Sequence, residues 1–135
     1  HLVRKEDLKR MKNFYQDINI KFKIKSFFTD IYDEINNSDL IISRCGASTL
    51  AEIEFFKKFC ILIPLPTSAN NHQFYNAVEF KKTNDCEIIN QLNINNDRLV
   101  EIIKSNLFEK KIKKIQQQRK TKKLSLVNII NDMLK

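Results

Sequence analysis

Two short apolar stretches, each leading into a polar loop and then a helical pattern, constrain the fold of this chain more than any other feature. Residues 39–43 and 59–64 are centred on unbroken apolar runs, which is typical of parallel strands buried on both faces. Helical spacing of apolar residues follows them over 48–56 and over 73–82. This alternation predicts an α/β fold with a mostly parallel sheet and right-handed crossovers. Sheets of this kind bind ligands at the carboxyl ends of their strands.

The segments on either side extend the same pattern. The sequence predicts a helix over 4–16, a strand with one buried face over 19–25, a helix after an N-cap at Thr29, a strand over 87–90, and two or three basic helices between 99 and 134. No linker rich in Gly, Ser or Pro divides these elements. We therefore expect residues 1–135 to form one domain, or part of one.

Composition excludes several classes of protein. With 42% hydrophobic residues among 135, the chain can form a core and is too apolar for a disordered tail. No apolar run approaches the roughly 18–20 residues that cross a bilayer, and the charged start does not resemble a signal peptide. Cys45, Cys60 and Cys86 form no C-x-x-C pair, which disfavours a disulfide framework or a zinc site and fits a reducing cytosol. The net charge of +8 indicates an anionic partner.

The loop after the first apolar run concentrates groups that can bind an anion. It contains Gly46, the only glycine of the chain, and leads into a helix that Ser48 or Thr49 opens. Free N–H groups at a helix start can bind phosphate or a sugar hydroxyl, and glycine allows close approach. Arg44 adds a cation, and Glu52, one turn beyond Ser48, can accept two ribose hydroxyls. An ordinary strand–helix turn with a capping Ser and a solvated Glu explains the same spacing equally well.

The loop after the second apolar run, residues 64–76, holds the other group of polar side chains. Asn71, His72 and Gln73 stand where the next helix starts, and amide side chains there can read sugar hydroxyls. For His72 alone, we favour capping of the helix by Asn70 or Asn71, with the His72 ring on the surface. Neither loop offers a metal-ligand cluster or a Ser-His-Asp set, and Cys45 is expected to be a packing residue.

The stretch Lys110–Lys123 is rich in lysine. Its simplest interpretation is the solvated face of a C-terminal helix. An anionic membrane surface or nucleic acid is the alternative. Nucleic acid is disfavoured, because no aromatic residue follows Phe108.

Taken together, the two loops resemble a known family. Residues 38–53, Ile63-Pro-Leu-Pro and Asn71-His-Gln-Phe-Tyr-Asn-Ala occur in the order and at the spacing of the C-terminal half of the MurG family. These bacterial enzymes transfer N-acetylglucosamine (GlcNAc) from UDP-GlcNAc to the undecaprenyl-linked muramyl-pentapeptide, lipid I, and so form lipid II. The resemblance implies a Rossmann-like C-terminal domain of a GT-B glycosyltransferase, an inverting hexosyltransferase that needs no metal and no cofactor in this half.

The resemblance also implies roles for individual residues. The segment 47–50 would contact the GlcNAc and diphosphate, Glu52 the ribose hydroxyls, and Gln73 with His72 the sugar hydroxyls. The backbone of Phe28 falls where the family holds the uracil. The predicted substrate-binding set is Phe28, Arg44, Gly46, Ala47, Ser48, Thr49, Leu50, Ala51, Glu52, His72, Gln73 and Asn76. No catalytic residue is expected in this chain.

Departures from the family pattern shape the remaining expectations. Cys45 replaces a Ser, Lys57-Lys58 replace Ala-Gly, and the acceptor domain with its catalytic His and a glycine-rich strand are missing. We therefore expect a partial donor-binding domain, incomplete at its N-terminal side, with residues 39–43 at an unpaired sheet edge and no transferase activity alone. The expected partners are UDP-GlcNAc, the lipid-linked acceptor mainly through the missing domain, and an anionic membrane surface, without nucleic acid. The expected location is the cytoplasmic face of the bacterial plasma membrane.

Two alternatives stay open. One is a stand-alone subunit of a two-component UDP-GlcNAc transferase, like the eukaryotic dolichol-pathway enzyme. The other is a basic interaction module without a catalytic role, which a salt-dependent affinity for nucleic acid and none for UDP would indicate.

Overall fold

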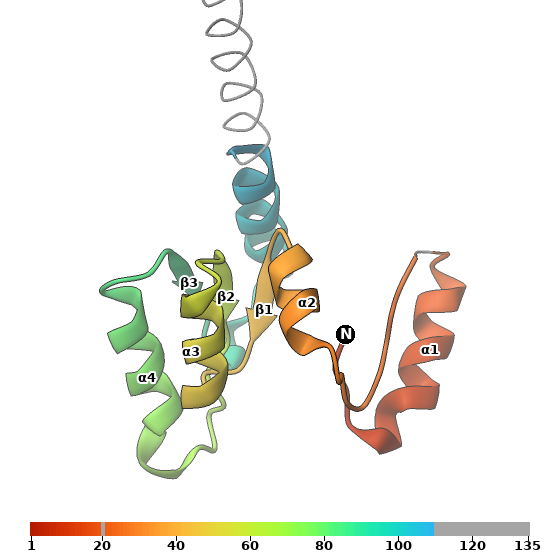
Figure 1. Ribbon diagram of the computed structural model, residues 1–135, viewed down its shortest axis with the longest axis horizontal. Coiled ribbons are helices and arrows are strands. Elements are labelled where there is room, and N and C mark those ends of the chain that lie inside the picture. The colour runs from red at the N-terminus through yellow and green to blue at the C-terminus, as the bar shows by residue number, and fades with distance from the viewer. Residues whose placement is uncertain (20, 110–135) are drawn as a thin grey trace, which may run out of the picture. The chain divides into compact units, whose positions relative to one another are not determined.

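The computed structural model describes residues 1–19 and 21–109 (Figure 1). They form two compact units, His1–Asn37 and a second unit that begins at Ser38. Each unit is described by itself. The basic helices predicted beyond residue 109 lie outside the described residues.

The first unit contains the 3₁₀ helix η1 (Lys5–Asp7), α1 (Leu8–Asp17) and α2 (Ile31–Asn37). Both predicted helices are therefore confirmed. The strand predicted over 19–25 is wrong: the described part forms only one parallel bridge, between Lys25 and Leu2. The extended segment bonds to the chain's own first residues instead, through Lys25 N–H to the His1 carbonyl (3.2 Å) and Val3 N–H to the Lys25 carbonyl (3.0 Å). An alternating pattern needs neighbouring strands to become a strand, and these few bonds do not supply them.

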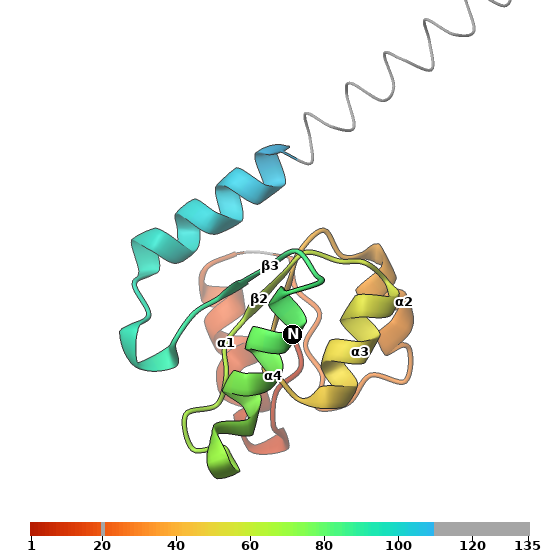
Figure 2. The same cartoon turned by 90° about the vertical axis from the view of Figure 1, so that its left-hand side faces the viewer.

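The second unit is built on a parallel sheet of three strands in the order β1-β2-β3. The strands are β1 (Ile41–Ser43), β2 (Cys60–Leu62) and β3 (Cys86–Ile88), and the crossovers are α3 (Ala47–Phe55) and α4 (His72–Lys81). Figures 1 and 2 show α3 and α4 side by side. The predicted α/β class, parallel sheet and order of elements are thus confirmed.

The core of this unit lies between the sheet and the two helices. It contains Leu50 and Ile53 from α3, Ala77 and Phe80 from α4, and the side chains Cys45, Cys60, Leu62 and Cys86. Ile61 alternates to the other face of β2 and is also 0% exposed, so β2 is buried on both faces as predicted.

Strand β1 departs from the prediction of burial on both faces. It stands at the end of the strand order, and Ile42 is 49% exposed. The continuous apolar run of residues 39–43 predicted burial on both faces, whereas the described sheet leaves β1 at its edge. The expectation of an edge at this strand, drawn from the missing glycine-rich strand, agrees with this order.

A further helix spans residues 96–109. It begins three residues earlier than predicted, because the Asn95 side chain accepts the N–H groups of Asp97 (2.9 Å) and Arg98 (3.2 Å) and caps the first turn. Within the described residues, no helix is long and apolar enough to cross a membrane.

Candidate functional site

The loop between β1 and α3 brings backbone N–H groups to the carboxyl end of the sheet. Helix α3 begins at Ala47 with Gly46 as its N-cap and without a side-chain cap, so the prediction that Ser48 or Thr49 opens the helix is wrong by one or two residues. The N–H of Leu50 makes the first bond of the helix, to the Gly46 carbonyl (3.0 Å). The N–H groups of residues 47–49 precede this bond and stay available for a ligand.

Gly46 leaves open space beside these N–H groups. Its backbone is extended, with φ −69° and ψ 142°, a conformation open to any residue. A Cβ atom built at this position would meet only Thr49 Oγ1 at 3.9 Å, which is ordinary contact. Neither the fold nor the packing of the described chain therefore requires glycine here.

The side chains around this helix start divide into two groups. Leu50 is 6% exposed and packs in the core, so its side chain supports the helix instead of facing a ligand. Ser48 and Ala51 are exposed and Glu52 is half-buried one turn further along α3. No hydrogen bond or ion pair of the Glu52 side chain is found within the described ranges, so its carboxylate is available to a partner.

Arg44 ties the first loop to the second. Its Nη1 donates to the carbonyl oxygen of Ile63 (3.0 Å) and, at a longer distance, to that of Pro64 (3.5 Å). The guanidinium therefore bonds backbone at the carboxyl end of β2 as well as carrying the positive charge that the sequence suggested for a phosphate.

Two amide side chains of α4 bind the same loops. Gln73 Oε1 accepts the N–H groups of Cys45 (3.2 Å) and Leu65 (3.0 Å). Asn76 Nδ2 donates to the Cys45 carbonyl (3.1 Å). The structure thus brings Gln73 and Asn76 to the loop that carries Gly46, a convergence that sequence spacing alone did not reveal.

His72 lies one residue before Gln73 on the surface of the molecule. Its Nδ1 is 2.8 Å from the Ala69 carbonyl, and the ring is exposed. The surface position agrees with the interpretation favoured for His72. The capping predicted with it is not found, because the N-cap residue of α4, Asn71, makes no side-chain capping hydrogen bond. The backbone before it takes left-handed angles at Asn70 (φ 48°) and Asn71 (φ 55°), which asparagine tolerates better than most residues.

Phe28 belongs to the first unit. Its side chain is 7% exposed, and the ammonium groups of Lys23 and Lys25 lie 5.8 Å and 5.0 Å from its ring centroid. The role implied for it concerned its backbone, so the buried ring leaves that role a prediction.

The three cysteines are free thiols buried in the second unit. Burial raises the pKa of Cys45 to about 11 and that of Cys60 to about 12, and it raises the pKa of Cys86 as well. The neighbouring Arg44 lowers the pKa of Cys45, but by less than burial raises it. Cys45 is therefore a packing residue, as expected, and not an activated nucleophile. Within the described residues, no group of His, Cys, Asp or Glu is arranged to hold a metal ion.

Two pockets were not foreseen from the sequence. One, of about 450 Å³, lies at the carboxyl ends of β2 and β3 and is mostly apolar; its lining includes Pro64, Leu65, Pro66, Asn71, Phe74, Ile88, Asn90 and Leu92. Its lining comes from the segment after β2, the start of α4, the end of β3 and the segment after β3, so no local motif marks it. Because its lining includes Leu65 and the start of α4, it extends the candidate site from the end of β1 toward the end of β3.

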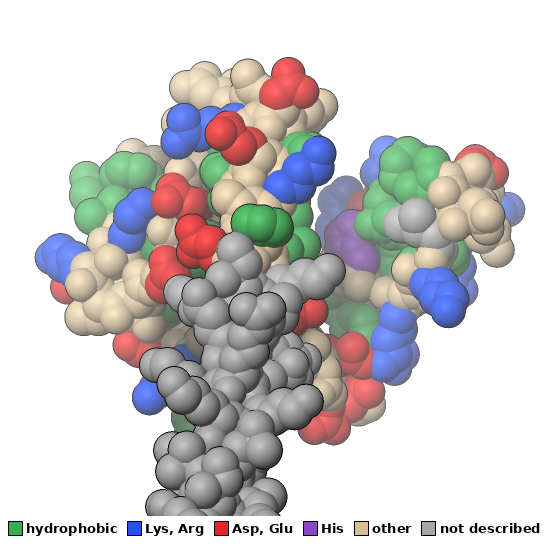
Figure 3. Space-filling view, turned by 90° about the horizontal axis from the view of Figure 1, so that it is seen from above, with side chains coloured by type: hydrophobic (Ala, Val, Ile, Leu, Met, Phe, Trp, Pro, Cys, Tyr) green, Lys and Arg blue, Asp and Glu red, His purple; other side chains and the backbone are tan. Residues whose placement is uncertain are grey.

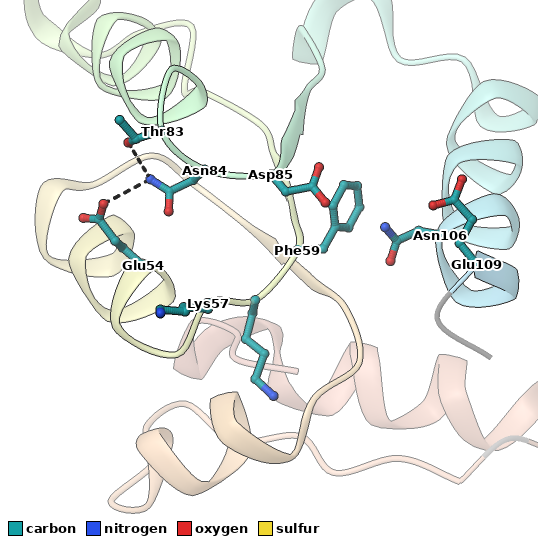
Figure 4. Close-up of a pocket in the computed structure, with 9 residues that line it drawn as sticks. Glu54, Lys57, Phe59, Thr83, Asn84, Asp85, Asn106 and Glu109 are labelled. Carbon is teal, nitrogen blue, oxygen red and sulfur yellow. Dashed lines mark hydrogen bonds between the residues drawn. The ribbon is translucent and has the colours of Figure 1, made fainter. Parts of the chain in front are cut away.

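The other pocket, of about 470 Å³, lies before the amino ends of β2 and β3, so it is at the opposite end of the sheet (Figure 4). Asn84 there donates to Glu54 Oε1 (3.1 Å) and Thr83 Oγ1 (3.0 Å), as the dashed lines in Figure 4 mark. None of the predicted site residues lines it. The candidate site is therefore at the carboxyl ends of the strands, where α/β sheets bind ligands.

Comparison with known proteins identifies the class. The chain belongs to the family of the glycosyltransferase family 28 C-terminal domain, whose sequence profile matches residues 1–133. This confirms the resemblance drawn from the two loop motifs.

Individual relatives narrow the class. The UDP-N-acetylglucosamine–N-acetylmuramyl-(pentapeptide) pyrophosphoryl-undecaprenol N-acetylglucosamine transferase of Rickettsia bellii (strain RML369-C) is 33% identical over 136 residues, covering 96% of this chain and 38% of that protein. The enzyme of the same name from Rickettsia africae (strain ESF-5) is 32% identical, with 96% and 36% covered. The crystal structure of MurG from Acinetobacter baumannii matches with a TM-score of 0.70 and 23% identity over 78% of this chain and 32% of that one. The chain thus has the fold of the MurG C-terminal region and spans little more than a third of the length of these curated relatives.

Proposed function

We propose that this chain is the donor-binding part of a transferase that moves GlcNAc from UDP-GlcNAc to the undecaprenyl-pyrophosphoryl-MurNAc-pentapeptide. The observation that carries the proposal is the start of α3: N–H groups of residues 47–49 without helical partners beside the open space at Gly46. A diphosphate is the ligand chemistry that such a helix start stabilises best. The family and the named relatives support UDP-GlcNAc as its carrier.

Each polar residue of the site then has a role. Ala47, Ser48 and Thr49 bind the diphosphate through backbone N–H groups, and the exposed Ser48 side chain adds a hydroxyl. The available carboxylate of Glu52 accepts the two ribose hydroxyls. The Nε2 group of Gln73 donates to sugar hydroxyls, since only its Oε1 is bonded within the described chain.

Transfer itself needs groups that the described residues do not supply. An inverting transfer requires a general base on the acceptor hydroxyl, and the family resemblance implies that this base is a His of the acceptor domain. We therefore propose that the rest of a longer polypeptide carries the base and most of the acceptor site, and that residues 1–135 alone bind the donor without transferring it.

The distribution of charge favours a location at an anionic membrane. Residues 1–109 contain fifteen basic and fifteen acidic residues, whereas residues 110–135 contain nine basic residues and one acidic residue. On the face seen in Figure 3, blue and red side chains are interspersed over the described residues. The whole net charge of +8 therefore resides in the last 26 residues of the sequence, the composition that binds anionic lipid on a cytoplasmic leaflet.

Calorimetric titration tests the donor assignment. UDP-GlcNAc, UDP and ADP are titrated into the wild-type chain and into Glu52→Ala, with circular dichroism to verify that each is folded. We expect UDP and UDP-GlcNAc to bind, ADP to bind more weakly, and Glu52→Ala to lose about tenfold in affinity, the effect of one or two hydrogen bonds to a charged group. Glu54→Ala, two residues along α3, is the matched control and should bind as wild type does.

Two results would refute parts of this proposal. Absence of UDP binding to a folded chain would show that residues 1–135 do not form a donor site. Equal binding of ADP and UDP would refute the uracil assignment at Phe28. The ribose assignment of Glu52 is tested separately by Glu52→Ala, because both nucleotides contain ribose.

A further inference from the structure

The backbone N–H and C=O of Cys45 are buried beyond the end of the sheet and need hydrogen-bond partners from elsewhere in the fold. Cys45 lies between the end of β1 and the start of α3 and is 0% exposed. A buried backbone N–H and C=O both need partners. The ladder between β1 and β2 pairs Ser43 with Leu62 as its last residues, so Cys45 lies beyond the sheet that would otherwise supply those partners.

Side chains from α4 satisfy both groups. The Cys45 N–H donates to Gln73 Oε1 (3.2 Å), and the Cys45 carbonyl accepts from Asn76 Nδ2 (3.1 Å). Gln73 and Asn76 are three residues apart on one helix and so present their side chains on the same face. Gln73 Oε1 also accepts the Leu65 N–H (3.0 Å), which extends the contact to the loop after β2.

The chemistry assigns the amide atoms without ambiguity. A backbone N–H can only donate, so Gln73 must turn its oxygen toward Cys45 and Leu65. A backbone carbonyl can only accept, so Asn76 must turn its nitrogen toward Cys45. The two amides therefore use opposite ends of the same functional group.

We propose that Gln73 and Asn76 are positioning residues: together they form a backbone clamp, defined as their contacts with Cys45 and Leu65, that holds the start of α3 in place for the nucleotide. Cys45 directly precedes Gly46 and the available N–H groups of residues 47–49. The clamp thus fixes the position of the groups that bind the diphosphate. Its consequence for binding rests on the proposed donor site, whereas the clamp itself exists without any ligand.

The same amide-to-acid change at the two positions gives opposite expectations. In Gln73→Glu, a carboxylate oxygen still accepts both N–H groups, so the clamp is kept. In Asn76→Asp, an oxygen replaces the donor and faces the Cys45 carbonyl, so the clamp is broken. Gln73→Met has a side chain of similar length but no strong acceptor, so it removes the bonds to the N–H groups of Cys45 and Leu65.

Amide hydrogen exchange of the ligand-free chain, followed by NMR, tests the clamp directly. We expect exchange at Cys45 and Leu65 to be about tenfold faster in Gln73→Met than in wild type, the scale of one lost hydrogen bond, and within about threefold of wild type in Gln73→Glu. Asn76→Asp should speed exchange at Cys45. Glu79→Gln, an exposed residue of the same helix that bonds Lys82, is the control and should change neither amide.

The outcomes decide the proposal even where a variant is unstable. Fast exchange at both amides in Gln73→Glu, or wild-type exchange in Gln73→Met, would overturn the clamp. Should Gln73→Met or Asn76→Asp not fold, a folded Gln73→Glu with protected amides still supports it, because only the acceptor was kept.

Titration separates positioning from direct sugar contact. If the clamp positions the phosphate-binding N–H groups, Gln73→Met loses affinity for UDP as well as for UDP-GlcNAc, with the larger loss for UDP-GlcNAc because the proposed contact of Nε2 with the sugar is lost too. Gln73→Glu retains the affinity for UDP. Loss of affinity for UDP-GlcNAc alone would mean that Gln73 acts only on the sugar, and would overturn the positioning role. Failure of wild type to bind either nucleotide refutes the proposed function instead, and the exchange measurement then still decides the clamp.

Discussion

At position 46 the backbone takes angles open to any residue, and only Thr49 Oγ1 lies near a built Cβ atom. Gly46→Ala should therefore fold, with a free energy of unfolding within about 1 kcal/mol of wild type. It should also bind UDP at least about tenfold more weakly, because the added methyl group occupies the space of the diphosphate. Urea unfolding and calorimetry on the same sample measure both effects. A variant that is stable and binds as wild type does would place the nucleotide elsewhere.

The buried thiols give the chain a dependence on alkaline pH. The pKa of Cys45 is raised from 9.0 to about 11 in the folded chain. Such a group stabilises the fold fully below pH 9, and this stabilisation is lost as pH rises from 9 through 11, since only the unfolded thiol ionises there. We expect the free energy of unfolding to fall between pH 8 and pH 10, and the fall to be about 1 kcal/mol smaller in Cys45→Ala. An identical fall in both proteins, measured by urea unfolding, would mean that Cys45 titrates normally.

At the scale of elements, the turn between α3 and β2 carries strain. Lys57 has φ 49°, which is unfavourable for a residue with a Cβ atom and favourable for glycine at a helix end. Lys57→Gly should therefore raise the free energy of unfolding by about 0.5–1 kcal/mol.

Lys57→Ala is the control for this prediction. It removes the same side chain and keeps the unfavourable angle, so its stability should stay near that of wild type. A gain of equal size in both variants would assign the effect to the lost lysine side chain, and not to the backbone.

How far the sequence predicted the elements depended on where each one finds its partners. Strand β2, α3 and α4 were predictable, because the pattern of apolar side chains within each segment, such as Ile53 and Ile61, already indicates which face is buried. The structure of segment 21–25 was not predictable. Alternating apolar and polar side chains indicate that one face can be buried, but they do not show whether a neighbouring strand is present to pair with it. For β1, the apolar run could not reveal which strand would be last in the sheet.

The candidate site was predictable to a similar extent. Gly46, Glu52 and the polar start of α4 were visible as motifs, because a strand followed by a glycine turn and a helix is a local pattern. The bonds from Gln73 and Asn76 to Cys45 were not visible, because they join residues 28 and 31 positions apart in the chain. Only the crossover from β2 to β3 brings α4 beside that loop.

At the scale of the whole molecule, the charge balance predicts two separable behaviours. Residues 1–109 are formally neutral, and the excess of positive charge lies beyond them. Replacing Lys110, Lys111, Lys113 and Lys114 by Gln should weaken binding to vesicles that contain anionic lipid by at least about tenfold at low salt. Nucleotide affinity should not change. Cosedimentation with vesicles measures the first effect and calorimetry the second.

The matched control replaces four lysines of the described region, Lys5, Lys9, Lys12 and Lys21, by Gln. It removes the same charge from the chain as a whole. Equal weakening in both variants would mean that vesicle binding follows net charge and not its concentration in the last residues.

Because the backbone angles at Gly46 are open to any residue, selection on function and not on folding decides which residue stands at position 46. Mutations there meet little resistance from folding, so only use of the site for a nucleotide would keep glycine in place over generations. In a copy of the gene that no longer binds a nucleotide, position 46 can be substituted without loss of stability, whereas substitutions in the core around Ile53 and Ile61 still destabilise the fold. The only glycine of this sequence stands at that position, which is the residue expected there if the site binds a nucleotide.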